Sequence, residues 1–342
     1  MVVGTGLPAD RAQVGITAAA ASLPEGRMTS AGLQRRVEGA SGLTFPAGFF
    51  ARVTGIRERR IARDDEQAST LAIRAARELF ARSGVRPADI DMLLFASASR
   101  DVTEPATAHI VQAGLGTSAH AFDIANACNS FLNGIDTARA FVLAGRARRV
   151  LVVTGETPTR AMRWQVKDIA EARTGFAGYT FGDAGAAVLV EPVTRGGILH
   201  LRTETFSEHW TVGGIAGGGS RHPRSPEHTY FHGNGAELRD VFERFGVAAI
   251  EKVRTDTGLT WDDYDRVLVH QVTVPYLDRF VELTGVPRDK LVVTVPELGN
   301  VASATLGVQL ARIEADLRPG ARVLFVGLGG GVSLMTMVWE KS

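Results

Sequence analysis

The stretch FDIANACNSF, Phe122–Phe131, joins a short apolar run to the start of a helical pattern and holds Cys128, the only cysteine of the 342 residues. Apolar residues recur at helical spacing from Phe131 to Val142, so the sequence predicts a strand, a turn at the cysteine and a helix. A thiol at such a junction feels the positive end of the helix macrodipole, which favours the nucleophilic thiolate. A buried, inert cysteine is the alternative, because free cysteine is among the most buried residue types.

On both sides of this junction, short β-rich runs alternate with amphipathic stretches, which is typical of an α/β fold with covered sheets. Two halves look alike, and we place them at residues 1–195, with the cysteine, and residues 196–342. The expected strands are 91–95, 121–124, 149–153 and 186–190 in the first half, and 266–270, 291–295, 322–326 and 333–338 in the second. Helices are expected at about 106–115, after Cys128, at about 275–283 and after Asn300.

Composition excludes several classes of protein. The chain has 38 Lys and Arg against 37 Asp and Glu, so no bias toward nucleic acid or a charged membrane surface is expected. A single cysteine allows no internal disulfide and fits a reducing cytoplasm. No apolar run is long enough to span a bilayer, and Met1–Leu7 lacks the parts of a secretory signal. We therefore expect a cytoplasmic protein.

Two further residues lie at predicted strand ends. His270 follows the apolar run 267–269, and Asn300 lies in PELGNVASA, residues 296–304. Taken singly, a structural imidazole and a helix N-cap explain them. Overlaying the halves puts Cys128 opposite Gly299-Asn300 and His270 opposite the end of the 93–95 strand. The carboxyl ends of strands are where open α/β sheets build their sites. Together the three form a nucleophile, its base and a group that polarises a carbonyl.

The glycine run GLGGG, residues 327–331, resembles a dinucleotide loop. Such a loop needs a following helix to hold the pyrophosphate, and here a strand is predicted instead, so we reject a nucleotide site. Glycines allow a backbone N–H to approach a reacting carbonyl oxygen. We expect an oxyanion hole made by the Cys128 N–H and a glycine N–H from Gly329, Gly330 or Gly331.

Two segments carry weaker signals. Glu104 precedes a proline just ahead of a predicted helix, where an acidic residue is ordinary. The segment 207–234 is rich in Gly, Arg and Pro and holds His222, His228 and His232. Their spacing fits no helical pair of ligands and no thiolate is nearby, so we expect a surface loop and no metal site.

Several motifs in one order carry a family resemblance: TGIRERRI (54–61), Ala127-Cys128, FGDAGAA (181–187), His270-Gln271, Gly299-Asn300 and GLGGG (327–331). Over almost the whole chain they resemble the condensing enzymes of the thiolase superfamily, specifically the β-ketoacyl-ACP synthase III group. The resemblance implies a five-layered α/β/α/β/α homodimer built from two duplicated halves. It also implies a catalytic triad of Cys128, His270 and Asn300, and no cofactor beyond CoA or ACP thioester substrates.

Within that superfamily the chain looks most similar to the acyl-CoA condensing enzymes of olefin and β-lactone biosynthesis. The similarity lies in SRD (99–101), EPATA (104–108), GID (134–136), GET (155–157) and HQV (270–272). It implies that Glu104 reaches across the dimer into the partner's site and removes an α-proton. Where synthases III carry a Trp and an Arg that grip CoA, this chain has Phe49 and Val53, so the acyl carrier stays open between CoA and ACP.

The expected activity follows from these residues. Cys128 accepts an acyl group from acyl-CoA or acyl-ACP, and His270 and Asn300 stabilise the enolate of a second thioester. The enolate arises by decarboxylation of a malonyl unit or by proton removal through Glu104, and Claisen condensation then gives a β-ketoacyl thioester. The alternatives are acyl transfer to an alcohol or amine without a new C–C bond, a silent partner subunit, and a non-enzymatic binding module.

Overall fold

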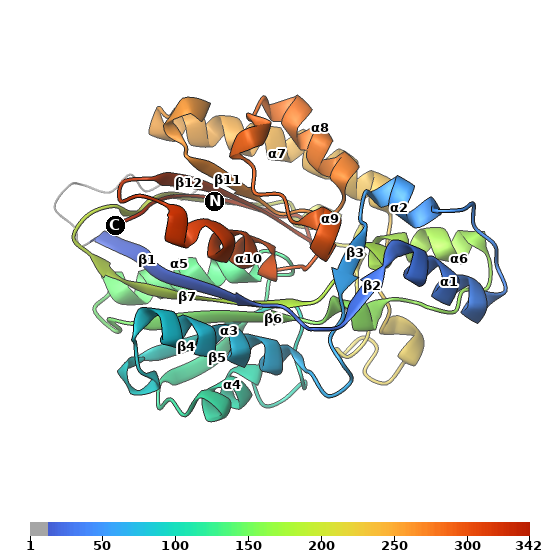
Figure 1. Ribbon diagram of the computed structural model, residues 1–342, viewed down its shortest axis with the longest axis horizontal. Coiled ribbons are helices and arrows are strands. Elements are labelled where there is room, and N and C mark those ends of the chain that lie inside the picture. The colour runs from blue at the N-terminus through green and yellow to red at the C-terminus, as the bar shows by residue number, and fades with distance from the viewer. Residues whose placement is uncertain (1–12) are drawn as a thin grey trace.

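Two β-sheets and three helical layers are stacked in this computed structural model, which describes residues 13–342 (Figure 1). The expectation about a secretory signal at Met1–Leu7 lies outside the described residues. The first sheet has the order β1-β7-β6-β4-β5. Its strands are β1 (Gln13–Ser22), β4 (Met92–Ala96), β5 (His120–Ile124), β6 (Val150–Glu156) and β7 (Ala184–Val193). The second sheet has the order β11-β12-β13-β8, with β8 (Gly197–Thr205), β11 (Arg266–Val269), β12 (Arg322–Gly329) and β13 (Ser333–Glu340).

Strand pairing shows the duplication directly. From β1 to β4 the successive pairs in the first sheet are antiparallel, antiparallel and parallel. From β8 to β11 the pairs in the second sheet follow the same order. The fold prediction of two similar α/β halves is therefore confirmed.

The predicted strand at 291–295 is wrong. Only an isolated parallel bridge between Val267 and Leu291 remains where β5 lies in the first half. The buried Gln271 side chain takes the backbone groups that a strand would use, because its Nε2 donates to Val292 O at 2.8 Å and its Oε1 accepts from Thr294 N and Val295 N at 2.9 and 3.0 Å. The chain then enters α9 (Val295–Leu298).

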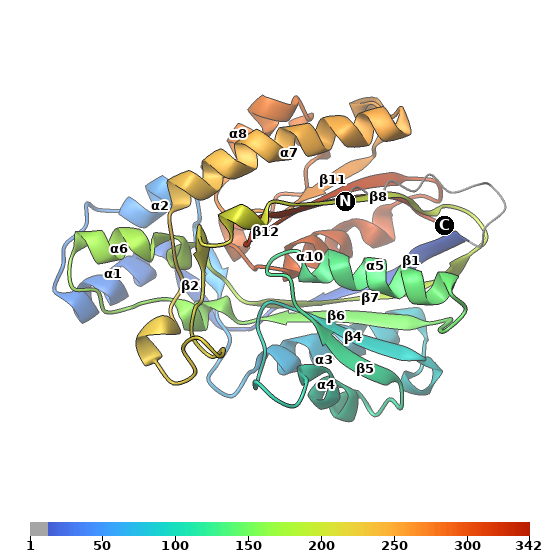
Figure 2. The same ribbon diagram turned by 180° about the vertical axis from the view of Figure 1, so that it is seen from behind.

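Helices fill the outer and middle layers, as Figures 1 and 2 show from opposite sides. One outer layer holds α3 (Ala68–Ser83) and α4 (Thr107–Leu115), and the other holds α7 (Gly235–Thr257) and α8 (Val274–Thr284). Between the sheets lie α5 (Ser130–Leu143) and α10 (Ala304–Ile313). The helices expected near 106–115, after Cys128, near 275–283 and after Asn300 are α4, α5, α8 and α10. None of the helices of the described residues is both long and apolar enough to cross a membrane.

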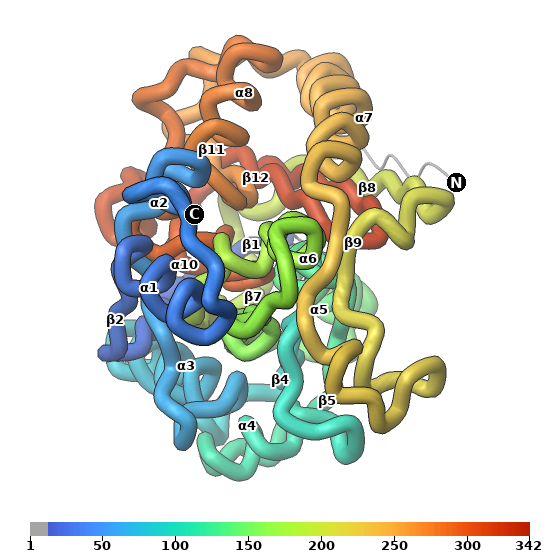
Figure 3. The backbone as a smooth tube through the Cα atoms, turned by 90° about the vertical axis from the view of Figure 1, so that its right-hand side faces the viewer, coloured from blue at the N-terminus to red at the C-terminus, as the bar shows by residue number. Residues whose placement is uncertain are grey.

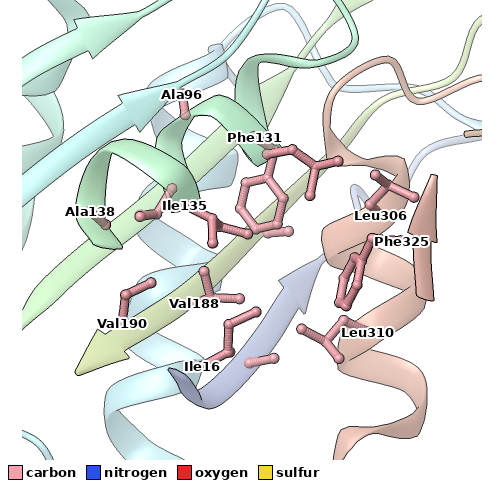
Figure 4. Close-up of a cluster of buried hydrophobic side chains, with 14 of the residues drawn as sticks. Ile16, Ala96, Phe131, Ile135, Ala138, Val188, Val190, Leu306, Leu310 and Phe325 are labelled. Carbon is pink, nitrogen blue, oxygen red and sulfur yellow. The ribbon is translucent and has the colours of Figure 1, made fainter. Parts of the chain in front are cut away.

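The main core lies between the two sheets, where α5 and α10 meet (Figure 4). Phe131 and Ile135 of α5 are fully buried at the helical spacing seen in the sequence, and Leu310 of α10 is fully buried beside them. Burying each such side chain contributes about 1.5–3 kcal/mol. This packing fixes the first turns of both middle helices, which begin close to Cys128 and Asn300.

An extension covers one end of the layers and is nearest the viewer in Figure 3. It consists of α1 (Ser30–Ser41), α2 (Phe49–Thr54), α6 (Ile169–Thr174) and the antiparallel pair of β2 (Arg27–Thr29) with β3 (Glu58–Arg60). The long excursion after β8 carries a second antiparallel pair, of β9 (Gly213–Gly214) with β10 (His232–Gly233). Short 3₁₀ turns complete the chain at Pro87–Asp89, Pro158–Ala161, Phe176–Thr180, Ser207–His209, Pro226–His228, Trp261–Asp263, Arg288–Lys290 and Glu314–Asp316.

Candidate active site

One cavity of about 1620 Å³ is lined by residues of both halves. Cys128, His270 and Asn300 all line it, and so do Gly330 and Gly331. Cys128 keeps part of its surface accessible although it lies deep in the protein, because it borders this cavity. The fold thus brings these three side chains to one cavity, as the sequence predicts, although Cys128 and Asn300 are 172 residues apart.

A tight turn holds Cys128 between β5 and α5. Ala127 adopts φ 46°, a left-handed conformation that costs energy for a residue with a Cβ. Ser130, the first residue of α5, stabilises the turn, since its Oγ donates to Ala127 O at 2.7 Å and accepts from Asn126 N at 2.8 Å. The strain is held at the residue that precedes the sulfur, so the turn aims Cys128 toward the cavity.

The glycine run meets this turn from the second half. Asn129 donates to Ser333 O and Ser333 Oγ, both at 2.8 Å, and a Cβ on Gly327 would come within 2.2 Å of Asn129 Oδ1. The backbone N–H groups of Gly330 and Cys128 lie close enough to the sulfur to lower the pKa of the thiol. Gly330 is thus the glycine of the expected trio that faces the thiol, while Gly329 belongs to β12 and makes room for Asn129.

The resting state of the thiol differs from the sequence expectation. Burial raises the pKa of Cys128 to about 12, and the negative charge of Glu156 acts in the same direction. The N–H groups of Gly330 and Cys128 lower the pKa but do not outweigh these two effects. The prediction that the helix macrodipole favours a thiolate is therefore wrong, because desolvation of the charge is the larger effect.

His270 follows β11 and is 4% exposed. The backbone N–H of His270 donates to Val326 O at 2.9 Å, which extends the pairing of β11 with β12 by one residue. Its Nδ1 is buried and has no hydrogen-bond partner among residues 13–342. Burial lowers the pKa of His270 to about 4, so the imidazole is neutral at pH 7 and can accept a proton or donate a hydrogen bond. Cys128 and His270 thus start as a neutral pair.

The backbone of the first half holds Asn300 in place. Asn300 N donates to Thr180 O at 2.8 Å, and Gly182 N donates to Asn300 O at 3.0 Å. A Cβ on Gly182 would come within 1.9 Å of Leu298 O, so only glycine permits this approach. The Asn300 Oδ1 accepts from Ala302 N at 3.0 Å, which leaves the side-chain NH₂ as the group offered to a ligand.

The overlay predicted from the sequence is shifted by three residues. Ala302 has φ 47°, like Ala127, and Thr305 Oγ1 donates to Ala302 O at 2.8 Å, as Ser130 Oγ does to Ala127 O. The residue that corresponds to Cys128 is therefore Ser303 and not Asn300. The left-handed alanines mark the correspondence, and no feature of the sequence shows their conformation.

Sequence reasoning missed the roles of two buried polar residues. Gln271 links the segment after His270 to the one before Asn300, as described above. Glu156 ends β6, is fully buried and lines the cavity. The sequence signal for Glu156 was a single acidic residue at the end of the segment RVLVVTGE, residues 149–156.

Glu104 does not line the cavity of its own chain and is exposed. It lies on the segment between β4 and α4, next to the cavity-lining residues Arg100 and Asp101. Asp101 anchors this segment through Ser69 N, which donates to its Oδ1 at 3.1 Å. A role for Glu104 in the site of its own chain is not supported by this placement.

The segment 207–234 is more than a surface loop. Gly213, Gly214 and Phe231 line the cavity, and Phe231 N donates to Ala161 O at 2.9 Å. The imidazoles of His222 and His228 stack at a centroid distance of 3.6 Å. In the part of the chain that the structure describes, no three His, Cys, Asp or Glu side chains group as a metal site would need.

Comparison with known proteins now gives the family. A model of 3-oxoacyl-[acyl-carrier-protein] synthase III matches residues 122–207, and the model of its C-terminal part matches residues 255–341. The β-ketoacyl-[acyl-carrier-protein] synthase III of Symbiobacterium thermophilum is 34% identical over 328 residues, 93% of this chain and 95% of that protein. The chain belongs to the synthase III family. The synthase III of Roseiflexus castenholzii is 32% identical over 332 residues, 94% of this chain and 96% of that protein.

Solved structures agree with this assignment. Xanthomonas campestris OleA, in a Glu-to-Ala variant, superimposes with a TM-score of 0.86 at 25% identity, covering 96% of this chain and 98% of OleA. A 3-oxoacyl-(acyl-carrier-protein) synthase III superimposes with a TM-score of 0.85 at 26% identity, covering 96% and 99% of the two chains. The predicted thiolase fold is confirmed. As a synthase III relative, the protein is an acyltransferase that joins two thioesters by Claisen condensation.

Proposed function

We propose that Cys128 is the nucleophile of this synthase III relative and that His270 and Asn300 activate the second thioester. The observation that carries the proposal is the shared cavity, because Cys128, His270 and Asn300 all line one space and Gly330 lines it as well. A condensing enzyme needs a nucleophile, an oxyanion hole and a second set of donors within reach of one another.

In the first half-reaction the Cys128 thiol attacks the carbonyl carbon of an acyl thioester while its proton passes to His270. The neutral state of both groups makes this transfer part of the attack, because no thiolate is formed beforehand. The N–H groups of Cys128 and Gly330 hold the oxyanion. The C–S bond of the donor then breaks, and the departing thiolate takes the proton from His270, which leaves an acyl-Cys128 intermediate.

In the second half-reaction His270 and the Asn300 NH₂ donate to the carbonyl oxygen of the second thioester. Its enolate forms by loss of CO₂ from a malonyl unit, or by loss of an α-proton to Glu104 of the partner subunit. The enolate carbon attacks acyl-Cys128, a C–C bond forms, and the Cys128 thiolate leaves. The thiolate regains a proton from Glu104 where an α-proton was removed, and from water where CO₂ was lost. Each preorganised donor at a developing negative charge contributes roughly 10²–10³ in rate.

We propose a CoA or ACP thioester as the acyl donor, with no further cofactor and no metal. A structure of OleA with bound lauric acid and lauroyl-CoA, which superimposes with a TM-score of 0.83 at 25% identity and covers 96% of this chain and 99% of that one, supports an acyl-CoA. Val53 lines the cavity and is 44% exposed, while Phe49 packs against Phe45 and Phe176. Neither replaces a guanidinium, so contacts to the carrier's phosphates come from elsewhere, and Arg239 and Arg279 line the same cavity.

We further propose a homodimer that works in the cytoplasm. The edge strand β5 pairs only with β4, so its other edge is free among residues 13–342 to pair with a second copy. The segment with Glu104 leads into α4, the helix that precedes β5. A lone free cysteine fits a reducing compartment.

The test is trapping of the acyl-enzyme. Incubation with an acyl-CoA is expected to add one acyl mass to the intact protein, and Cys128→Ala is expected to abolish both the adduct and condensation while the protein stays folded by circular dichroism. Because the chain has one cysteine, the adduct can be assigned without a second thiol to exclude. Thr255→Ala, at an exposed position on α7 that leaves the thiol and its turn in place, is the control. Turnover by Cys128→Ala would refute the proposal, and a product with the atoms of only one thioester would mean acyl transfer to an alcohol or amine.

A further inference from the structure

Glu156 is a buried acid without a basic partner. It is fully buried at the end of β6, lines the cavity and forms no ion pair with any residue in 13–342. Hydrogen bonds hold it instead. Its Oε1 accepts from Ala98 N at 2.7 Å and from Ser303 Oγ, and its Oε2 accepts from Ser99 N at 3.0 Å and Ser99 Oγ at 2.7 Å. A buried carboxylate requires such a set of donors to remain in the protein.

These donors come from two places that border the catalytic residues. Ala98 and Ser99 belong to the turn after β4, and both line the cavity. Ser303 precedes α10, corresponds to Cys128 in the other half and follows Asn300 by three residues. Glu156 therefore ties the cavity wall of the first half to the turn that carries Asn300 in the second.

Glu156 does not act as the base for an α-proton. A carboxylate offers about four lone-pair positions, and two backbone N–H groups and two hydroxyls already occupy them. Ser97 Oγ also lies within 3.0 Å of Oε1 but gives its proton to Gly155 O at 2.6 Å. No lone pair is left for a substrate proton, so any effect of Glu156 on the reaction comes from its position and its charge.

We propose that Glu156 is a positioning residue of this active site, which holds the 97–99 turn and the start of α10 in register and places a negative charge in the wall of the cavity that Cys128 lines. The inference deepens the proposed function and rests on Cys128 as the nucleophile. The charge adds to burial in keeping the Cys128 sulfur protonated until His270 accepts the proton.

The field at the sulfur supports this assignment. Burial is the first cause that raises the pKa of Cys128, and Glu156 is the charged group that adds to it. The other carboxylates that line the cavity are Asp101, Asp123 and Glu243. The basic and phenolic groups that line it, besides His270, are Arg100, Arg160, Arg173, Arg239, Arg279 and Tyr276. None of these groups acts on the sulfur as Glu156 does.

The charge is tested by the pH dependence of alkylation by iodoacetamide, followed by intact mass. Glu156→Gln removes the charge and keeps the size, and is expected to move the alkylation midpoint to lower pH by about one unit, which means about tenfold faster labelling at pH 9. Asp183→Asn is the matched control, because Asp183 is also a fully buried carboxylate held by hydrogen bonds, from Ala62 N and Thr159, and does not act on the sulfur. A folded Glu156→Gln protein with the wild-type profile would overturn the proposal.

The positioning role is tested by Ser303→Ala, which keeps the charge and removes one donor from Glu156. This variant is expected to keep the wild-type alkylation profile and to lose about tenfold or more in kcat of condensation, because the turn that carries Asn300 is displaced. Wild-type kcat in Ser303→Ala would contradict the positioning role. This variant also keeps the proposal testable if Glu156→Gln fails to fold. Alkylation needs no turnover, so a failure of the proposed condensation would leave the charge test intact.

Discussion

The His270 imidazole shows how burial sets the behaviour of a single side chain. Its pKa of about 4 lies below the ordinary value of 6.5, so between these values the unfolded chain binds a proton that the folded protein does not. Unfolding therefore becomes easier as pH falls from 6.5 toward 4, and this one group costs about 2.5 kcal/mol of stability at pH 4.5 relative to pH 7. Above about pH 7.5 this cost is negligible.

We predict that His270→Asn removes this part of the acid sensitivity. Urea unfolding at pH 7 and pH 4.5 is expected to show a loss of stability that is about 2.5 kcal/mol smaller in the variant than in the wild type. His109→Asn, at an exposed position on α4, is the control and is expected to follow the wild type closely. An equal loss in His270→Asn and wild type would contradict the low pKa of His270.

For Cys128, the sequence showed the local secondary structure but not the burial and the charges that surround the side chain in the folded protein. The sequence predicted the strand, turn and helix around Cys128 correctly, because an apolar run and a helical period lie next to one another there. The protonation state of the thiol was predicted wrongly, because the depth of burial and the nearby Glu156 charge are tertiary properties. The local dipole argument had no access to either.

Among the elements, the segment 291–295 shows how one side chain replaces a strand. Its β-branched residues predict a strand, but Gln271 binds the backbone at three points and Pro296 lies in the first turn of α9. Propensity was overridden by a tertiary hydrogen-bond set. The strands with two covered faces, such as β6 and β12, were predicted to within one residue at their starts, but each extends three residues beyond its predicted end.

We predict that Gln271→Met destabilises the protein by about 3 kcal/mol, because three hydrogen bonds are lost and buried backbone groups stay unpaired. Gln309→Met is the matched control, since Gln309 is also buried but makes a single bond, to Val269 O at 3.0 Å, and is expected to cost about 1 kcal/mol. Urea unfolding measures both. Equal effects of the two substitutions would show that the Gln271 contacts do not hold the segment.

For the whole molecule, the repeat was visible in the sequence because each half repeats the same order of apolar runs. The register between the halves was not visible, so the overlay set Cys128 opposite Asn300, whereas in the structure Cys128 corresponds to Ser303. The sequence also did not show that Glu104 lies outside the cavity of its own chain, because this placement follows from the tertiary fold. In the proposed homodimer Glu104 acts in the site of the partner subunit, and this role can be tested.

We predict that Glu104→Gln abolishes condensation of two simple acyl-CoA molecules and retains condensation with a malonyl thioester, because only the first route needs proton removal. Mixing Glu104→Gln with Cys128→Ala subunits is then expected to restore about a quarter of the wild-type activity, since half of the dimers are mixed and each has one complete site. Size-exclusion chromatography with tagged subunits verifies the mixed dimer. No recovery in a verified mixed dimer would contradict a role for Glu104 across the interface.

The paired left-handed alanines give the two halves the same bend with different roles. Ala127 precedes a cysteine, whereas Ala302 precedes a serine whose hydroxyl supports Glu156. The second bend therefore braces the wall of the cavity that Cys128 lines. Under the proposed mechanism neither half holds all three reacting residues, so dividing the chain between the halves is expected to leave two fragments with no activity until they reassemble.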